Sequence, residues 1–145
     1  MQDAAGRLLV CQIAALTSVQ LQRQETGFFL QPRRPSLIAG ERQRNARLEG
    51  SICDALLAPT PGNITFPLAQ RLLAPGLVVS DDEVLDAMEL AFREFKLVVE
   101  PGGAVALAAA LTGKLPVKGR AVAVVCSGGN VDHATFARAL GRRTA

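Results

Sequence analysis

The sequence has few of the residues that most often mark a site. Its 145 residues include no tryptophan, no tyrosine and one histidine, and the three cysteines are far apart. Because no Cys-x-x-Cys pair or Cys/His cluster occurs, neither a zinc site nor a disulfide framework is expected. The single histidine, His133, has no serine or cysteine partner in a meaningful position, so the sequence gives no support for a catalytic triad.

Long apolar runs are also missing. None approaches the roughly 20 residues that a membrane-spanning helix needs. The short run of residues 8–16 is interrupted by Gln12 and preceded by Asp3, which is unlike a secretory leader. The cysteines lie among apolar neighbours, which predicts buried free thiols in a cytoplasmic protein. The arginine clusters lack interleaved aromatics, so we expect solvated faces and no nucleic-acid site.

What the sequence does contain is material for a core. Almost half of its residues are apolar, mostly Ala, Leu and Val, in a chain of single-domain length. This mixture favours close-packed helices on a short buried sheet over a β-sandwich. We therefore predict an α/β fold with a partial open, mostly parallel sheet and flanking helices.

The first third of the chain is harder to interpret. Residues 7–11 fit a buried strand, and residues 14–24 fit a helix. The prolines within residues 32–35 should break any regular element, because they remove donors and restrict the preceding residue. The charged residues 41–49 should be solvated. We therefore treat residues 1–49 as a divergent, partly irregular segment, and residues 50–145 as the α/β part.

From residue 51 onward the pattern is more regular. Residues 58–63 predict a turn-rich loop, residues 65–73 a helix and residues 77–79 a strand. Ser80 and Glu83 form the pattern of a capping box. We predict that it starts a long helix whose apolar residues keep helical spacing to Phe95. The capping box also gives the acidic run Asp81-Asp82-Glu83 a structural explanation in place of a metal site.

The last part alternates helix and strand. Residues 104–111 predict a buried helix with almost no polar face, and Gly113 is placed to end it. Residues 121–126 predict a strand buried on both faces. Residues 131–140 predict another helix, capped by Asp132.

The junction Ser127-Gly128-Gly129-Asn130 is the first candidate site, because ligands of open α/β sheets gather at the carboxyl ends of strands. Two glycines let backbone pass close to a flat ligand, and the Ser127 hydroxyl can donate or accept a hydrogen bond. The same residues also fit a simple turn. Glu100 is the second candidate. It precedes Pro101 and two glycines, and serves either as an acid/base group or as a structural acceptor for amides at the N-terminus of the next helix.

Five stretches occur here in a characteristic order: Ser51–Ala55, Thr60–Gly62, Val78–Asp81, Lys96–Ala104 and Cys126–Asp132. In order and spacing they resemble the pyridoxal-phosphate-dependent serine/threonine dehydratases, which include threonine ammonia-lyases and are similar to serine racemase. The resemblance covers about 90 of the 145 residues. It implies the fold of the tryptophan-synthase-β-like (fold type II) enzymes, pyridoxal phosphate as cofactor and a small hydroxy-amino-acid substrate.

The resemblance also implies roles for individual residues. Ser127 matches the serine that hydrogen-bonds the pyridine nitrogen, Glu100 a glutamate near the cofactor and substrate, and Gly128 and Gly129 backbone that lines the ring. Asp54 matches an aspartate usually followed by glycine, whereas Ala55 stands here.

Other positions depart from the family. No lysine of this sequence stands in the context of the Schiff-base lysine, so no catalytic residue is assigned. Residues 12–15 (Gln-Ile-Ala-Ala) stand where a glycine-rich phosphate loop would be needed, and their side chains would block backbone amides from wrapping a phosphate. The chain therefore resembles a truncated part of a dehydratase and is expected to be inactive alone.

Three functions remain open from the sequence. The leading one is a part of an enzyme that eliminates water from serine or threonine to give a 2-oxo acid and ammonia. The second is a non-catalytic module, as a homo-oligomer or joined to a fuller dehydratase subunit through the surface of residues 80–96. The third is an independent phosphate- or nucleotide-binding α/β domain with its site at Gly128–Gly129.

Overall fold

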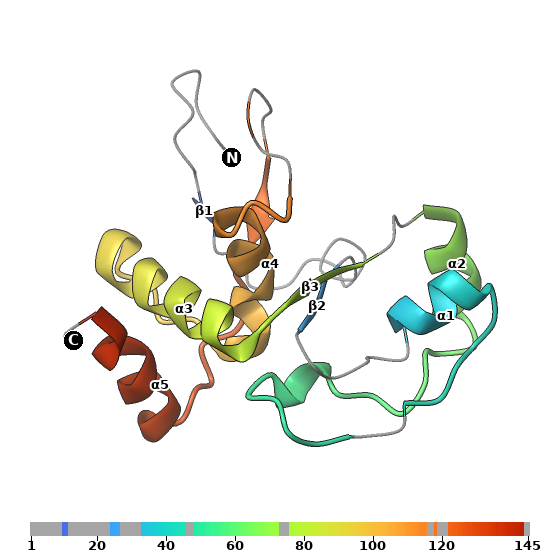
Figure 1. The fold of residues 1–145 in the computed structure, drawn as a ribbon, viewed down its shortest axis with the longest axis horizontal. Helices are drawn as coiled ribbons and strands as arrows, with labels where there is room; N and C mark the ends of the chain where they lie inside the picture. The colour runs from blue at the N-terminus through green and yellow to red at the C-terminus, as the bar shows by residue number, and fades with distance from the viewer. Residues whose placement is uncertain are drawn as a thin grey trace.

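The computed structural model describes residues 10–11, 24–26, 33–45, 48–72, 76–115, 118 and 122–143. The sequence-based predictions for residues 12–15, and for most of 7–11 and 14–24, lie outside the described residues. The elements in chain order are β1 (Val10–Cys11), β2 (Gln24–Thr26), α1 (Arg33–Ala39), the 3-10 helix η2 (Asp54–Leu56), α2 (Thr65–Leu72), β3 (Leu77–Val79), α3 (Asp81–Phe95), α4 (Pro101–Leu111), β4 (Val124–Val125), α5 (His133–Leu140) and the 3-10 helix η3 (Gly141–Arg143) (Figure 1).

The strands pair in parallel, which agrees with the α/β prediction. In β1 and β4, Val10 lies opposite Val124, and in β2 and β3, Gln24 lies opposite Leu77. These are two separate two-stranded pairs, and the described residues form no single open sheet. Of the strand predicted over residues 121–126, only β4 (Val124–Val125) is present among the described residues, and residue 121 lies outside them. After Cys126 the chain turns toward the start of α4, where the Glu100 amide donates to the Gly128 carbonyl.

Helices α3 and α4 build the core. In α4, eight of the eleven residues from Pro101 to Leu111 are buried, as its nearly unbroken apolar composition predicts. The long helix α3 packs against it through Val84, Leu85 and Met88, all at most 2% exposed. Helix α5 lies on another side of α3 (Figure 1). There the rings of Phe92 and Phe136 meet edge to face with their centroids 5.4 Å apart.

The start and end of α3 follow local chemistry. The predicted capping box is confirmed: the Glu83 amide donates to Ser80 Oγ at 3.2 Å, and the Ser80 amide donates to Glu83 Oε2 at 2.6 Å. The helix ends at Lys96, whose backbone is left-handed with φ 58°, and there the Leu97 amide donates to the Ala91 carbonyl at 3.1 Å.

Helix α4 begins three residues earlier than predicted. Pro101 occupies its first position, where the missing N–H would have no intrahelical partner anyway, and Glu100 precedes it as the N-cap. The end of α4 is confirmed, since Gly113 follows with φ +74°. Helix α5 begins at His133, and its predicted cap is confirmed: Asp132 Oδ1 accepts from the Thr135 amide at 2.9 Å.

The prediction that Pro32 and Pro35 break regular structure is wrong for residues 33–35, whereas Pro32 lies outside the described residues. Helix α1 begins at Arg33 and includes Pro35, which stands in the first turn, where an absent amide proton costs no hydrogen bond. Helix α1 contacts α2, and Gln70 of α2 donates to the Gly40 carbonyl at 2.7 Å. No helix in the described part of the chain is long and apolar enough to cross a membrane.

Candidate functional site

Two loops that follow apolar segments meet at one point of the molecule. The Glu100 amide donates to the Gly128 carbonyl at 3.1 Å, and the Asn130 amide donates back to Glu100 Oε2 at 3.2 Å. The Glu100 carboxylate therefore accepts from a backbone amide, but the prediction that this amide stands at the N-terminus of the next helix is wrong. The amide belongs to the 127–130 turn and not to α4, for which Glu100 provides no side-chain cap.

Two glycines are needed for this approach. A Cβ on Gly128 would lie 2.3 Å from Glu100 Cδ, and the residue has φ +77°, where side chains are disfavoured. A Cβ on Gly103 would lie 1.7 Å from the Ser127 carbonyl oxygen. The 127–130 turn and the first turn of α4 are therefore in direct contact, with no room for side chains between them.

A small pocket opens beside this contact. It has a volume of about 80 Å³. Its walls come from η2, from the first turns of α4 and from the turn after β4. The lining residues are Ala55, Leu56, Glu100, Gly102, Val105, Ala106 and Ser127. Most of this wall is apolar, with one carboxylate and one hydroxyl, a composition typical of small-molecule sites.

A second, wider pocket of about 310 Å³ adjoins the first. It shares Ala55, Glu100 and Gly102 with the first pocket and adds mainly polar groups. Its lining residues are Asp54, Ala55, Glu100, Pro101, Gly102 and Asn130. We call the 80 Å³ pocket the inner pocket and the 310 Å³ pocket the outer pocket.

Of the four candidate residues predicted from the sequence, two line the inner pocket and two lie in the turn beside it. Ser127 and Glu100, which are 27 residues apart in the sequence, both line the inner pocket. Gly128 and Gly129 lie in the adjoining turn and are not among its lining residues. The Ser127 side chain is half-buried, and no hydrogen bond links its hydroxyl to another described residue. That hydroxyl is thus available to a bound molecule.

The sequence did not reveal what holds the η2 wall. Asp81, at the start of α3, accepts from the Ser51 hydroxyl at 2.8 Å and from the Ile52 amide at 3.2 Å. Ser51 Oγ in turn accepts from the Cys53 amide at 3.1 Å. These contacts fix the stretch of chain that enters η2. No local pattern connects Ser51 with Asp81, because the two residues are 30 positions apart.

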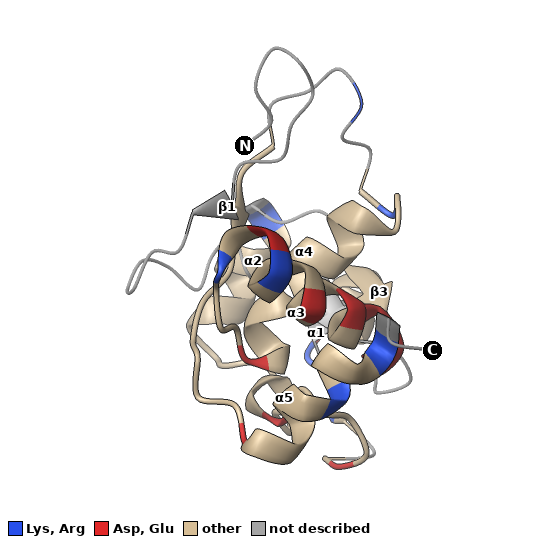
Figure 2. Cartoon of the chain, turned by 90° about the vertical axis from the view of Figure 1, so that its left-hand side faces the viewer, with Lys and Arg blue, Asp and Glu red and all other residues tan. Residues whose placement is uncertain are grey.

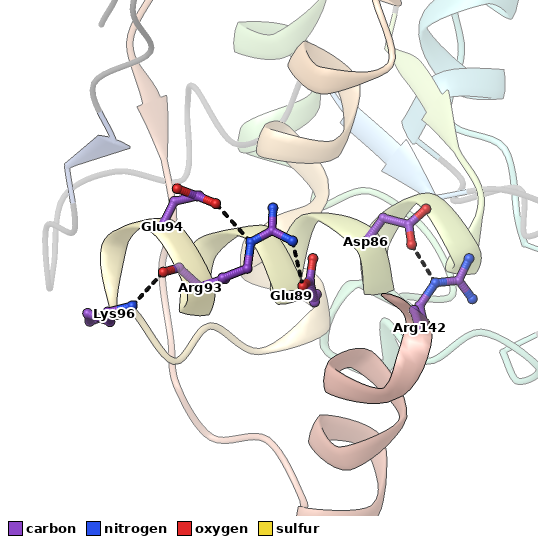
Figure 3. Close-up of polar contacts among 6 residues, drawn as sticks. All are labelled: Asp86, Glu89, Arg93, Glu94, Lys96 and Arg142. Carbon is purple, nitrogen blue, oxygen red and sulfur yellow. Dashed lines mark hydrogen bonds and ion pairs between the residues drawn. The ribbon is translucent and has the colours of Figure 1, made fainter. Parts of the chain in front are cut away.

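The three lysines of the sequence lie away from both pockets. Lys96, at the end of α3, donates to the Arg93 carbonyl at 2.6 Å (Figure 3). Lys114 forms an ion pair with Glu83, and Lys118 is exposed. None of the three is a lining residue. No lysine of this chain therefore has the desolvated position that nucleophilic catalysis by an amine requires.

The described cysteines and the histidine offer no further chemistry. Cys53 and Cys126 are buried, as predicted, and neither forms a disulfide with another described residue. Burial raises the pKa of the Cys126 thiol to about 11. A thiol with that pKa stays protonated at neutral pH and is a poor nucleophile. His133 is exposed in the first turn of α5. Within the part of the chain that the structure describes, no three His, Cys, Asp or Glu residues are grouped to hold a metal ion.

The outer surface of α3 carries ion pairs instead of a site. Arg142, near the end of the chain, pairs with Asp82 and Asp86, and Arg93 pairs with Glu89 and Glu94. Figure 2 colours the acidic and basic positions, and Figure 3 shows the contacts of Arg93 and the one between Arg142 and Asp86. Hydrogen bonding to Asp86 raises the pKa of Arg142. The region of residues 80–96 is thus covered by α4 on one side and contacted by α5 and η3 on another, and its use as a partner surface stays a prediction.

Comparison with known proteins connects this site to a family. Residues 24–128 match the model of the pyridoxal-phosphate dependent enzymes. The chain is 41% identical over 101 residues to an L-threonine ammonia-lyase of Thermotoga maritima, covering 68% of this chain and 25% of the relative. It is 44% identical over 92 residues to a phenylserine dehydratase of Ralstonia pickettii, covering 63% of this chain and 28% of the relative.

Comparison with solved structures connects the chain to the same family. The structure resembles the crystal structure of a serine racemase from Dictyostelium discoideum with a TM-score of 0.61 at 35% identity, over 70% of this chain and 32% of that one. The chain thus spans a quarter to about a third of the length of the proteins it matches. It belongs to the pyridoxal-phosphate-dependent enzyme family, as a partial fold type II domain related to threonine dehydratases and serine racemases.

Proposed function

We propose that this chain forms one wall of a pyridoxal-phosphate site in an ammonia-lyase for serine or threonine. The reaction of such an enzyme eliminates water from the hydroxy amino acid and gives a 2-oxo acid and ammonia. One observation carries the proposal: Ser127 and Glu100, from distant parts of the sequence, line the same small pocket, and its other walls are mainly apolar.

The composition of the inner pocket suits the ring of the cofactor. Leu56, Val105 and Ala106 offer apolar surface to a flat ring, and the Ser127 hydroxyl offers a neutral hydrogen-bonding group. A hydroxyl can donate to or accept from a ring nitrogen, so it does not force that nitrogen to be protonated. When bound, pyridoxal phosphate supplies delocalisation of the negative charge that develops at the α-carbon of the substrate.

Glu100 is suited to the substrate side of the ring. It lines both the inner and the outer pocket, so its carboxylate borders the apolar and the polar space. The Asn130 amide holds one carboxylate oxygen. A carboxylate has further acceptor capacity beyond one such bond, which allows it to orient an ammonium or hydroxyl group of a substrate.

Proton abstraction from the substrate is not assigned to this chain. All three lysines of the sequence lie outside the pocket-lining set. The proposal therefore covers binding and orientation by Ser127 and Glu100. It leaves the base to a group that the described pocket does not contain.

The binding role is tested by measuring the affinity for pyridoxal phosphate in equilibrium dialysis. Removing one neutral hydrogen bond, by Ser127→Ala, should weaken binding about 3- to 10-fold. The matched control is Thr112→Ala, which removes a hydroxyl that bonds the Ala108 carbonyl at 2.8 Å at the far end of α4. The control should bind as the wild type does. An unchanged affinity in Ser127→Ala, or equal losses in both variants, would contradict the proposal.

A further inference from the structure

We infer that Gly102 is a specificity-determining residue whose missing side chain keeps the passage between the two pockets open. The inference builds on the proposed function, because it concerns the size and shape of the molecule that the same site accepts. The passage, which we call the throat, is defined by Ala55, Glu100 and Gly102, the three residues that line both pockets.

Two neighbouring glycines of α4 differ in what they are needed for. At Gly103 a Cβ would lie 1.7 Å from the Ser127 carbonyl oxygen, so this glycine is required by the packing of the chain itself. At Gly102 a Cβ would lie 3.4 Å from Leu56 Cγ and 3.7 Å from the Ala55 Cβ, which are ordinary van der Waals contacts. The fold therefore has room for a methyl group at position 102.

The backbone does not explain Gly102 either. The residue lies in the first turn of α4 and is not among the glycines with positive φ. Glycine in a helix is less favourable than alanine, because it loses more backbone freedom on folding. Both helix propensity and packing would thus favour alanine at this position. What alanine would take away is space in the throat.

The throat lies between surfaces of different polarity. The inner pocket has apolar side chains from η2 and α4, and the outer pocket has Asp54, Glu100 and Asn130. A molecule that occupies both pockets has a flat apolar ring in the inner pocket, a polar group in the outer pocket and a narrow linking group at the throat. On one side the Ala55 methyl already limits the width. The residues at positions 55 and 102 together therefore determine how wide the linking part of a ligand can be where it passes through the throat.

The first arm of the test needs no ligand. Thermal unfolding is followed for the wild type, Gly102→Ala and Gly103→Ala. We expect Gly102→Ala to keep or raise the midpoint by a few degrees, whereas Gly103→Ala lowers it. A drop in Gly102→Ala similar to that of Gly103→Ala would show that Gly102 is required by packing, and the inference would fail.

The second arm measures ligand binding by the amide chemical shifts of Ala106 and Ser127. The probes are pyridoxal phosphate and 3-hydroxypyridine, which has the ring and no phosphate. We expect Gly102→Ala to weaken binding at least 10-fold and Ala55→Gly to bind at least as well as the wild type. Binding of the ring alone by the wild type, lost in Gly102→Ala, would support the limit that position 102 sets on ligand size, even if pyridoxal phosphate fails to bind and the proposed function falls. If neither probe shifts these amides, or Gly102→Ala binds normally, the inference is wrong.

Discussion

At the scale of single residues, the contact between Glu100 and Gly128 organises the site. The Glu100 amide bonds the Gly128 carbonyl, and the Glu100 carboxylate fills the space where a side chain of residue 128 would stand. Gly128 is therefore constrained twice, by a φ of +77° and by the carboxylate. These two constraints can be separated by mutation, because only the second depends on Glu100.

Gly128→Ala should lower the free energy of unfolding by about 2–5 kcal/mol. About 1–2 kcal/mol comes from the left-handed backbone and about 1–3 kcal/mol from the overlap with the carboxylate. In a Glu100→Ala background the overlap disappears, so the same substitution should cost only about 1–2 kcal/mol. Urea unfolding of the four chains gives both values.

Gly113→Ala is the matched control for this cycle. Gly113 has φ +74°, but a Cβ added there would meet nothing within 4 Å. Its substitution should cost about 1–2 kcal/mol whether or not Glu100 is present. If the cost of Gly128→Ala is the same in both backgrounds, the carboxylate does not fill that space and the described contact is wrong.

The sequence could identify these residues but not their contact. Ser127 and Glu100 were recognisable as candidates because each follows an apolar segment and lies next to glycines or to a proline followed by glycines. That the Glu100 carboxylate accepts from Asn130 depends on how β4 approaches α4, which no local pattern shows. The bond from Ser51 to Asp81 was missed for the same reason.

At the scale of elements, α3 is the best example of structure specified locally. Its capping box places the Glu83 carboxylate between the Ser80 amide and the Lys114 ammonium. Burial by itself would raise the pKa of Glu83, but hydrogen bonds from Lys114 and from the Ser80 backbone outweigh it, so the pKa lies below its ordinary value of 4.5.

This lowered pKa predicts a pH dependence of stability. A carboxylate whose pKa is lower in the folded state stabilises the fold fully above its unfolded pKa. That contribution is lost as the pH falls below about 4.5 and through the folded value. Glu83→Gln keeps a side chain suited to the capping box and removes the charge, so it should lose less stability than the wild type between pH 6 and about pH 3. The difference should be about 0.5 kcal/mol, since the pair is partly exposed to solvent.

Urea unfolding midpoints at the two pH values measure this effect. Lys114→Gln should also lose less stability than the wild type at low pH, as Glu83→Gln does, because it removes the ammonium partner of Glu83. Lys118→Gln is the control, since Lys118 is exposed and has no ion pair among those found in the described residues. Equal acid-dependent losses in the wild type and Glu83→Gln would contradict the assigned role of Glu83.

Element boundaries were predictable where side chains set them, and less so elsewhere. The caps Ser80 and Asp132 and the terminator Gly113 are where the sequence indicated. Helix α4 starts early because Pro101 fits a first helical position, and Gly103 is needed for contact with Ser127 and not for a break. A glycine or proline therefore does not mark a loop when a tertiary contact requires it. In α4 this contact is the close approach of Gly103 to the Ser127 carbonyl.

At the scale of the whole molecule, the site depends on segments far apart in the sequence. The 3-10 helix η2, the start of α4 and the residues after β4 all line the inner pocket. The parallel pairs of β1 with β4 and of β2 with β3 join residues 10–11 to residues 124–125 and residues 24–26 to residues 77–79. Parallel pairing was predictable from the alternation of helices and short apolar strands. The partner of β1 was not, because two or three residues carry too little pattern to set a register. Strand β2 was not predicted at all, and its first residue, Gln24, was assigned to the end of a helix.

The inner pocket, which these distant segments build together, is proposed to take the ring of pyridoxal phosphate. A crystal structure of this chain grown with pyridoxal phosphate is the most direct measurement of that role. We expect the ring between Leu56 and Val105, with its nitrogen within about 3.2 Å of Ser127 Oγ. The proposal would be contradicted by a cofactor attached to Lys96, Lys114 or Lys118 on the surface while the inner pocket stays without it.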